Sequence, residues 1–201
     1  MRRGTLTFIF GCMFSGKTTE LLRRVRLREP AAVRCFRHAR DRRYDPRAIV
    51  SHAGERYPAC SIAAPAEILA HLDPGVELVA VEEAHFFDAS LIDVLRTLVT
   101  RGVDVVSTSL DLNCWGQPLP IAETLRRLAD EPLHLTTRCA RCGASADHTQ
   151  RLTPIVNGNL IGGPESFEPR CANCWHPPPE PPQPMPWRTT PSASAGKDDA
   201  C

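Results

Sequence analysis

Apolar runs alternate with amphipathic segments along the first two-thirds of the chain. Continuous apolar or β-branched runs are typical of strands buried in a parallel sheet, and they predict strands at residues 5–10, 31–36, 78–81, 103–110 and 133–136. The segments between them carry apolar residues at helical spacing and predict helices at residues 19–28, 65–72, 89–101 and 121–129. This alternation is typical of an α/β fold in which helices cover both faces of a parallel sheet.

Two details of the pattern concern individual side chains. In the first helix, the buried face is predicted to consist of Leu21, Leu22, Val25 and Leu27. Residues 37–47 are strongly basic and have no periodicity, which predicts a loop whose arginines are mostly solvated.

The turn between the first strand and the first helix fits the pattern G-x-x-x-x-G-K-[ST] of a phosphate-binding P-loop. Its residues are Gly11, Cys12, Met13, Phe14, Ser15, Gly16, Lys17 and Thr18. In such a loop the backbone N–H groups and the helix N-terminus bind phosphates, because both present partial positive charge. Lys17 would reach the β- and γ-phosphates of ATP, and the Thr18 hydroxyl would bind Mg²⁺. Within an alternating α/β pattern, this loop predicts a RecA-like parallel sheet.

Two carboxylates follow the apolar strand at residues 78–81. Ligands bind at the carboxyl ends of the strands in parallel sheets, so Glu82 and Glu83 should face the P-loop. Glu82 is placed for Mg²⁺, and Glu83 is placed to accept a proton from an acceptor hydroxyl. Because adjacent residues of a strand point to opposite sides, the two should do different work. The alternative is a solvated surface pair.

The character of the chain changes after residue 137. Two C-x-x-C pairs can present four thiolates to one structural Zn²⁺; they are Cys139, Cys142, Cys171 and Cys174. His176 is a possible substitute ligand, and unpaired buried cysteines or a redox pair are the alternatives. We therefore predict three parts, which are a nucleotide-binding domain at 1–137, a zinc-binding subdomain at 138–176 and a disordered Pro-rich tail at 177–201.

Composition limits the classes of binding partner that we expect for this chain. The 201-residue chain has a formal net charge of +1. Near-neutral charge disfavours a zinc-bearing nucleic-acid module, and we expect neither a nucleic acid nor a membrane as partner. The N-terminal apolar run is too short for a secretory signal, and no stretch approaches about 18 apolar residues. We therefore expect a cytoplasmic protein.

Residues 11–23 resemble the P-loop of the cellular-type (type II) thymidine kinases. Other segments similar to that family follow in order and with similar spacing between about residues 5 and 176; they are 41–44, 51–52, 82–87, 110–113, 149–152 and 161–167. The two C-x-x-C pairs stand where that family binds structural zinc.

The resemblance implies transfer of the γ-phosphate of ATP to the 5′-hydroxyl of a deoxynucleoside, thymidine above all. It implies that Glu83 is the general base and that Glu82 and His85 join the ATP-binding residues. Residues 158–167 resemble the family's lasso, which closes over the base. The implied nucleoside-binding residues are Met13, Asp41, Arg43, Phe86, Leu110, Thr149, Ile161, Gly162 and Phe167. The family is typically tetrameric, which implies a homo-oligomer.

Several positions depart from the family pattern. Glu82 stands where Asp is usual, His85 where Gln is usual, and Phe167 where Tyr is usual. The other departures are Cys12, Cys114, Trp115 and Leu119. They leave open an alternative, in which the chain is a nucleotide-binding P-loop and zinc protein with a degraded kinase site and a regulatory or structural role. They also leave the acceptor nucleoside open.

Overall fold

A six-stranded parallel sheet forms the centre of the molecule. The computed structural model describes residues 2–41, 43, 45–155 and 161–179. The strands lie in the order β5-β2-β6-β7-β1-β8, and each pair of neighbours is parallel. Their bounds are β1 Leu6–Phe10, β2 Val33–His38, β5 Cys60–Ile62, β6 Leu78–Val81, β7 Asp104–Ser109 and β8 Glu131–His134. The predicted parallel α/β sheet is confirmed.

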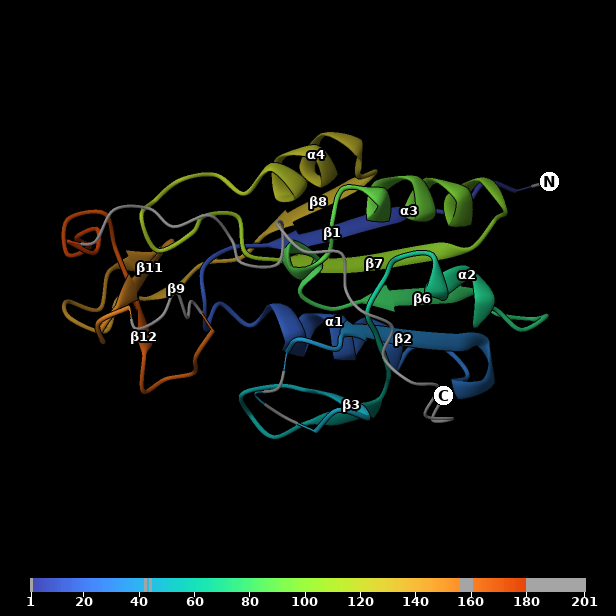
Figure 1. Cartoon of the computed structure of the whole chain (residues 1–201), viewed down its shortest axis with the longest axis horizontal. Helices are drawn as coiled ribbons and strands as arrows, with labels where there is room; N and C mark the ends of the chain where they lie inside the picture. The colour runs from blue at the N-terminus through green and yellow to red at the C-terminus, as the bar shows by residue number, and fades with distance from the viewer. Residues whose placement is uncertain (1, 42, 44, 156–160, 180–201) are drawn as a thin grey trace.

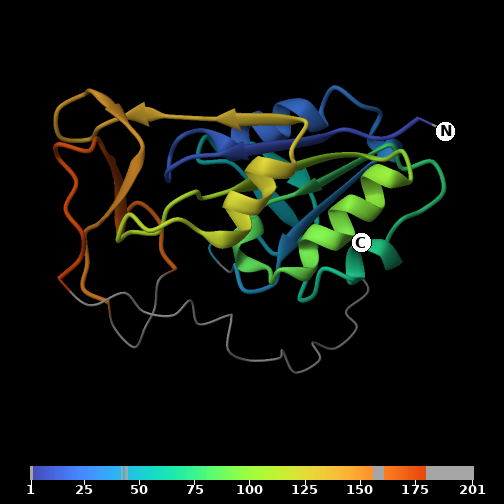
Figure 2. The same ribbon diagram turned by 90° about the horizontal axis from the view of Figure 1, so that it is seen from above.

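Helices cover both faces of this sheet (Figures 1 and 2). On one face, α2 (Glu67–Ala70), α3 (Ser90–Thr100) and α4 (Pro120–Leu128) pack on Phe8, Val79 and Val105. On the other face, α1 (Lys17–Val25) packs on Ile9, Ala80 and Val106. The inner strands β1, β6 and β7 are buried along their whole length and place alternate side chains against different helices, which favours apolar and β-branched residues at successive positions.

The first helix is shorter than its sequence pattern predicted. Leu21, Leu22 and Val25 are fully buried, but α1 ends at Val25 and Leu27 is 70% exposed. The prediction that Leu27 belongs to the buried face is wrong, because the residue lies beyond the last helical turn.

A small hairpin and an edge strand were not predicted. The strands β3 (Ala48–Val50) and β4 (Arg56–Pro58) form an antiparallel pair, and β5 forms one edge of the large sheet. All three strands have only three residues, so they are too short to show a period. Two 3₁₀ helices, η1 (Pro30–Ala32) and η2 (Ala84–Phe86), complete this part of the chain.

The prediction that residues 37–47 form a solvated loop is wrong at its start. Arg37 and His38 are the last residues of β2, and both are buried. Arg37 is 1% exposed and donates hydrogen bonds to the carbonyl oxygens of Asp41, Asp45 and Ala48. A guanidinium carries five N–H donors, so it can hold a folded segment of backbone without an apolar pattern in the sequence.

We expect His38 to make the protein less stable in acid. Burial lowers the pKa of His38 from 6.5 to about 4, and the positive charge of Arg40 lowers it further. The nearby carboxylates, which oppose this shift only in part, are those of Asp41, Asp88 and Glu67. The unfolded chain then binds a proton that the folded chain does not, so the free energy of unfolding falls as the pH falls from 6.5 towards 4. The loss at pH 4 is up to about 3 kcal/mol.

Denaturant unfolding of the wild type and His38→Asn at several pH values measures this contribution. An Asn oxygen can replace the ring Nδ1 that accepts a hydrogen bond from the Arg40 N–H at 3.0 Å. The variant should show a shallower pH dependence between pH 4 and 6.5, and an identical slope in both proteins would contradict the prediction.

Two small antiparallel sheets follow β8. They pair β9 (Thr137–Arg138) with β10 (Ser145–Ala146), and β11 (His148–Arg151) with β12 (Phe167–Arg170). Figure 1 shows both beyond the carboxyl ends of β1 and β8. Residues 156–160 of the predicted lasso and residues 180–201 of the predicted tail lie outside the described residues. Among the described residues, every helix is too short or too polar to cross a membrane.

Candidate active site

The P-loop joins β1 to α1 and has an unusual backbone. Gly11 and Gly16 have φ angles of 145° and 86°, and Phe14 has a φ of 65°. A Cβ on Gly11 would lie 2.0 Å from the Leu135 carbonyl oxygen, so this position excludes any side chain. The loop thus wraps closely against the chain that follows β8.

Lys17 and Thr18, at the start of α1, both point into the loop region. Lys17 is buried, and its Nζ donates a hydrogen bond of 2.6 Å to the Cys12 carbonyl oxygen. Burial lowers the pKa of Lys17, while the nearby Glu83 carboxylate opposes that effect. The Thr18 Oγ1 donates to Glu82 Oε1 at 2.9 Å. The P-loop and the end of β6 are therefore in direct contact.

Glu82 and Glu83 diverge, but not for the reason that strand alternation suggests. β6 ends at Val81, and Glu83 has a left-handed backbone with φ 51° and ψ 53°. That conformation is uncommon for a residue with a side chain, and the Glu83 N–H donates to Thr108 Oγ1 at 3.1 Å. The strand was predicted to end at Val81, as β6 does, but the alternation of side chains along a strand does not apply to the two glutamates that follow it. A turn at Glu83 separates the two carboxylates.

The pKa values of the two carboxyl groups are shifted in opposite directions. Burial and the charge of Glu83 raise the pKa of Glu82 to about 8. Burial also opposes ionisation of Glu83, but His85, Arg43 and Lys17 together lower its pKa to about 2. Burial lowers the pKa of His85 to about 4, so its ring is neutral at pH 7. Arg43, which donates a hydrogen bond to Glu83 directly, is therefore the cation that best accounts for an ionised Glu83 at neutral pH.

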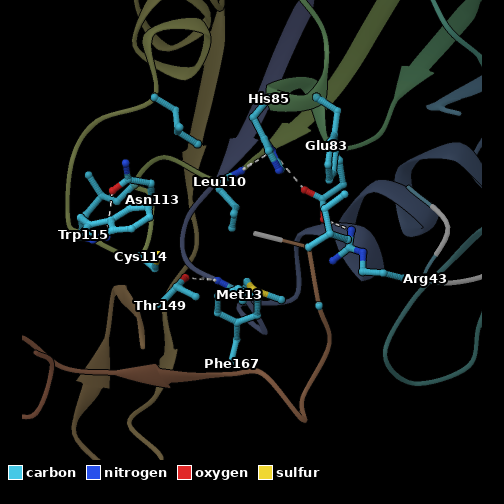
Figure 3. A pocket seen from close by; sticks show the side chains of 15 residues that line it. Met13, Arg43, Glu83, His85, Leu110, Asn113, Cys114, Trp115, Thr149 and Phe167 are labelled. Carbon is cyan, nitrogen blue, oxygen red and sulfur yellow. Dashed lines mark hydrogen bonds and ion pairs between the residues drawn. The ribbon is translucent and has the colours of Figure 1, made fainter. Parts of the chain in front are cut away.

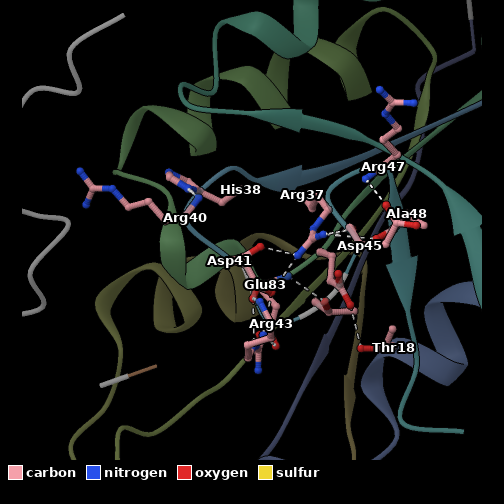
Figure 4. A network of polar contacts seen from close by, with 12 residues as sticks. Thr18, Arg37, His38, Arg40, Asp41, Arg43, Asp45, Arg47, Ala48 and Glu83 are labelled. Carbon is pink, nitrogen blue, oxygen red and sulfur yellow. Dashed lines mark hydrogen bonds and ion pairs between the residues drawn. The ribbon is translucent and has the colours of Figure 1, made fainter. Parts of the chain in front are cut away.

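Arg43 connects the buried carboxylates (Figure 4). It makes two 2.8 Å hydrogen bonds to the carboxylate of Asp41 and one of 2.9 Å to Glu83 Oε1. Asp41 is 4% exposed, and Arg37 holds its backbone from behind. This network fixes one oxygen of Glu83. The other, Oε2, makes no hydrogen bond within the described residues, although His85 Nδ1 lies 3.4 Å away.

Two cavities meet at this carboxylate. The apolar cavity is shown in Figure 3. The P-loop cavity lies between the P-loop and the carboxylates that follow β6. Met13, Arg43 and Glu83 line both, so they form the wall between them. The lining of the P-loop cavity is completed by Phe14, Gly16, Lys17, Thr18, Thr19, Asp41, Val50, His52, Ala53 and Glu82.

The nucleoside-binding residues that the sequence predicted converge on the apolar cavity, apart from Asp41. Those lining it are Met13, Arg43, Phe86, Leu110, Thr149, Ile161, Gly162 and Phe167. Asp41 lines only the P-loop cavity. The Met13 N–H donates to Thr149 Oγ1 at 3.0 Å, which attaches the P-loop to β11. The guanidinium of Arg151 stacks 4.7 Å from the ring centre of Phe167.

Four predicted ATP-binding residues do not line the P-loop cavity. His85 lines the apolar cavity instead. Gly11, Cys12 and Ser15 line neither cavity. Cys12 is 1% exposed and its Sγ faces the Ala146 carbonyl oxygen at 3.6 Å, so its side chain points away from a bound phosphate.

Sequence reasoning missed part of each lining. The β3–β4 hairpin brings Val50, His52 and Ala53 to the P-loop cavity, and the ring centre of His52 lies 4.5 Å from that of Phe14. The family-like pair Ser51-His52 was the available signal. The loop after β7 adds five residues to the apolar cavity, and three of them had been noted only as departures from the family; the five are Leu112, Asn113, Cys114, Trp115 and Leu119.

Four cysteines gather between the two small sheets. The ligand atoms of Cys139, Cys142, Cys171 and Cys174 all lie within 4.8 Å of one another. A tetrahedral Zn²⁺ with Zn–S bonds of about 2.3 Å needs sulfur atoms about 3.8 Å apart, and the Cys142 and Cys171 Sγ atoms are 3.6 Å apart. The cluster therefore fits a structural zinc. His176 is outside it, and its backbone instead pairs with the side-chain amide of Gln150.

Two comparisons place this geometry among known proteins. The family model described as thymidine kinase matches residues 4–175. Among solved structures, the Legionella pneumophila ATPase DotB matches with a TM-score of 0.37 and 18% identity, over 64% of this chain and 34% of the DotB chain. The chain thus spans about a third of the DotB chain.

Proposed function

We propose that this chain, which belongs to the thymidine kinase family, transfers the γ-phosphate of ATP to the 5′-hydroxyl of a deoxynucleoside, with thymidine as the preferred acceptor. In this proposal residues 1–137 bind the nucleotide, and residues 138–176 hold the metal and close over the nucleoside. The observation that carries it is the position of Glu83, on the wall that the P-loop cavity and the apolar cavity share.

The P-loop cavity is the proposed site of the ATP phosphates. Lys17 and the backbone N–H groups of the loop would bind the phosphate oxygens, because both present positive charge to the P-loop cavity. Thr18 and Glu82, already 2.9 Å apart, would hold Mg²⁺, since hydroxyl and carboxylate oxygens are ligands that it accepts. Bound there, the cation would neutralise charge on the phosphates.

The apolar cavity is the proposed site of the nucleoside. Its aromatic and aliphatic lining suits a base and the carbon face of a sugar. A sugar hydroxyl at the shared wall would meet Glu83 Oε2, which makes no hydrogen bond within the described residues. The hydroxyl oxygen would attack the γ-phosphorus, and the bond between that phosphorus and the oxygen bridging it to the β-phosphate would break, which releases ADP. The proton of the hydroxyl would pass to Glu83. Arg43 holds the other oxygen of Glu83 and so orients the carboxylate.

A nucleoside panel tests the proposal. Purified protein with MgATP is offered thymidine, deoxyuridine, deoxycytidine and purine deoxynucleosides, and both ADP and nucleoside monophosphate are measured. Thymidine should give equal amounts of ADP and monophosphate. ATP binding without acceptor-dependent turnover would overturn the kinase proposal and favour the second candidate, a nucleotide-binding protein with a degraded site. That candidate is favoured by Cys114 and Trp115 on the pocket wall.

Lys17→Met separates the two proposed binding sites. Because charged hydrogen bonds contribute about 1.5–3 kcal/mol, we expect the Kd for MgATP to rise about 10–100-fold while the Kd for thymidine stays within about twofold. Isothermal titration calorimetry measures both constants. Arg23→Met, on the exposed side of the same helix, is the matched control. An unchanged Kd for MgATP in Lys17→Met would contradict the assigned phosphate site.

Family membership also supports a homo-oligomer, for which a tetramer is the proposed size. Size-exclusion chromatography with light scattering at several protein concentrations measures it, and a monomer throughout would contradict it.

A further inference from the structure

One wall of the apolar cavity is a compact turn after β7. Asn113 closes this turn, because its Oδ1 accepts hydrogen bonds of 3.0 Å from the N–H groups of both Trp115 and Gln117. The Asn113 N–H donates to the Gln117 carbonyl oxygen at 2.9 Å. Cys114 and Trp115 are thereby held on the cavity wall, where both are buried (Figure 3). These hydrogen bonds hold residues 113–117 in one conformation, so the position of the turn sets the shape of this part of the cavity.

The indole of Trp175 packs against this turn. A Cβ on Gly116 would lie 2.8 Å from Cη2 and 3.2 Å from Cζ2 of Trp175, so the ring touches the Gly116 backbone. The ring of His148 lies near the same indole, with centres 4.8 Å apart. The indole Nε1 is buried and makes no hydrogen bond within the described residues. Among the residues that the structure describes, the indole is therefore held by packing.

The cysteine cluster determines where Trp175 lies. Trp175 follows Cys174 directly, and the N–H groups of both residues donate to the Cys171 carbonyl oxygen at 2.9 Å. His148 belongs to β11, whose next residue, Thr149, accepts the hydrogen bond from the Met13 N–H. The segment that carries the cysteines thus contacts Met13, which lines the cavity, and Gly116, which directly follows the lining residues Cys114 and Trp115.

We propose that Trp175 is a positioning residue for the nucleoside pocket, which transmits the geometry of the four-cysteine cluster through Gly116 to the wall formed by Cys114 and Trp115. The inference rests on the proposed function, because it takes the apolar cavity as the nucleoside site. The zinc-binding segment then sets the affinity for the nucleoside, beyond stabilising its own fold.

Substitutions at the contact test this coupling. Trp175→Ala should raise the KM for thymidine about tenfold or more, since small displacements of a binding wall are costly. The kcat, the KM for ATP and the zinc content should stay within about twofold of the wild type. Trp175→Phe, which keeps an aromatic ring, should recover most of the loss. Leu152→Ala, at an exposed apolar side chain of the same segment, is the control.

A double-variant cycle isolates the contact between Trp175 and Gly116. Gly116→Ala puts a methyl group against the indole, so it should raise the KM for thymidine in the wild-type background. Gly116 has a φ of 74°, so the alanine strains the backbone in both backgrounds, and only its contact with the indole depends on Trp175. In the Trp175→Ala background the methyl group meets no ring, and the fold increase in the KM for thymidine should be at least threefold smaller. Equal effects in both backgrounds would mean that the two residues act independently, which overturns the proposal.

A measurement without nucleoside separates this inference from the proposed function. Cys114 is 7% exposed, and iodoacetamide labelling resolved by mass spectrometry reports how well the turn covers it. Trp175→Ala should speed labelling of Cys114 about fivefold or more, whether or not the protein is a kinase. Unchanged labelling and unchanged KM would overturn the inference. Loss of zinc in Trp175→Ala would also overturn it, because the residue would then serve the metal site.

Discussion

Replacing Glu83 with Gln is expected to lower kcat about 10²–10⁴-fold while the Kd for MgATP stays within about threefold. The amide has the shape of the carboxylate and can still accept the hydrogen bond from Arg43, but it cannot take the hydroxyl proton. The pKa of Glu83, about 2, makes it a weak base. A weak base suffices when phosphoryl transfer is loose and the proton leaves late, so the lower end of the range is expected.

Single-turnover measurements with saturating MgATP and thymidine give the chemical step for Glu83→Gln directly. Glu123→Gln, which removes an exposed carboxylate on α4, is the matched control and should leave kcat unchanged. A wild-type rate in Glu83→Gln would remove Glu83 from the chemistry. The acceleration of phosphoryl transfer would then have to come from Arg43 and the phosphate site alone.

Replacing Cys171 with Ser is expected to reduce the zinc content from about one ion per chain to a small fraction of that value. A structural zinc contributes on the order of 10 kcal/mol of binding free energy to folding, and serine lacks the thiolate that completes a tetrahedral site. The two small sheets are too short to replace that contribution with a core of their own. We therefore expect a lower Tm and faster proteolysis of residues 138–176.

Elemental analysis and calorimetry measure the two effects of Cys171→Ser. Cys35→Ala provides the control, because Cys35 is buried in β2 outside the cluster. The Cys35→Ala protein should therefore keep its full zinc content. Full zinc content together with an unchanged Tm in Cys171→Ser would exclude a four-cysteine zinc site.

Local sequence patterns predicted the sheet and the phosphate loop well, for physical reasons. The strands β1, β6 and β7 are buried on both faces, which requires continuous apolar runs that are visible without a structure. The P-loop is a contiguous motif whose glycines are needed for its backbone, at Gly11 by direct contact with Leu135. The cysteine cluster was predictable because each C-x-x-C knuckle is local.

Other parts of the site depend on contacts that no local pattern records. Arg37 looked like a solvated residue of a basic segment, yet it is buried because three carbonyl groups surround it. His85 was grouped with the phosphate site, but η2 turns it into the apolar cavity. The turn at Glu83 could not be inferred from strand periodicity, since a left-handed residue has no signature in a two-residue repeat.

The sequence by itself determined the parallel α/β fold, the P-loop and the four cysteines, because each depends on the spacing of nearby residues. Only the tertiary structure decided that Met13, Arg43 and Glu83 stand between two cavities, and that Trp175 presses on Gly116. Residues of the first set are 30 to 70 positions apart in the chain, and Trp175 and Gly116 are 59 positions apart. Such pairs are brought together by the packing of the whole sheet and its attached segments, and a one-dimensional pattern does not contain that information.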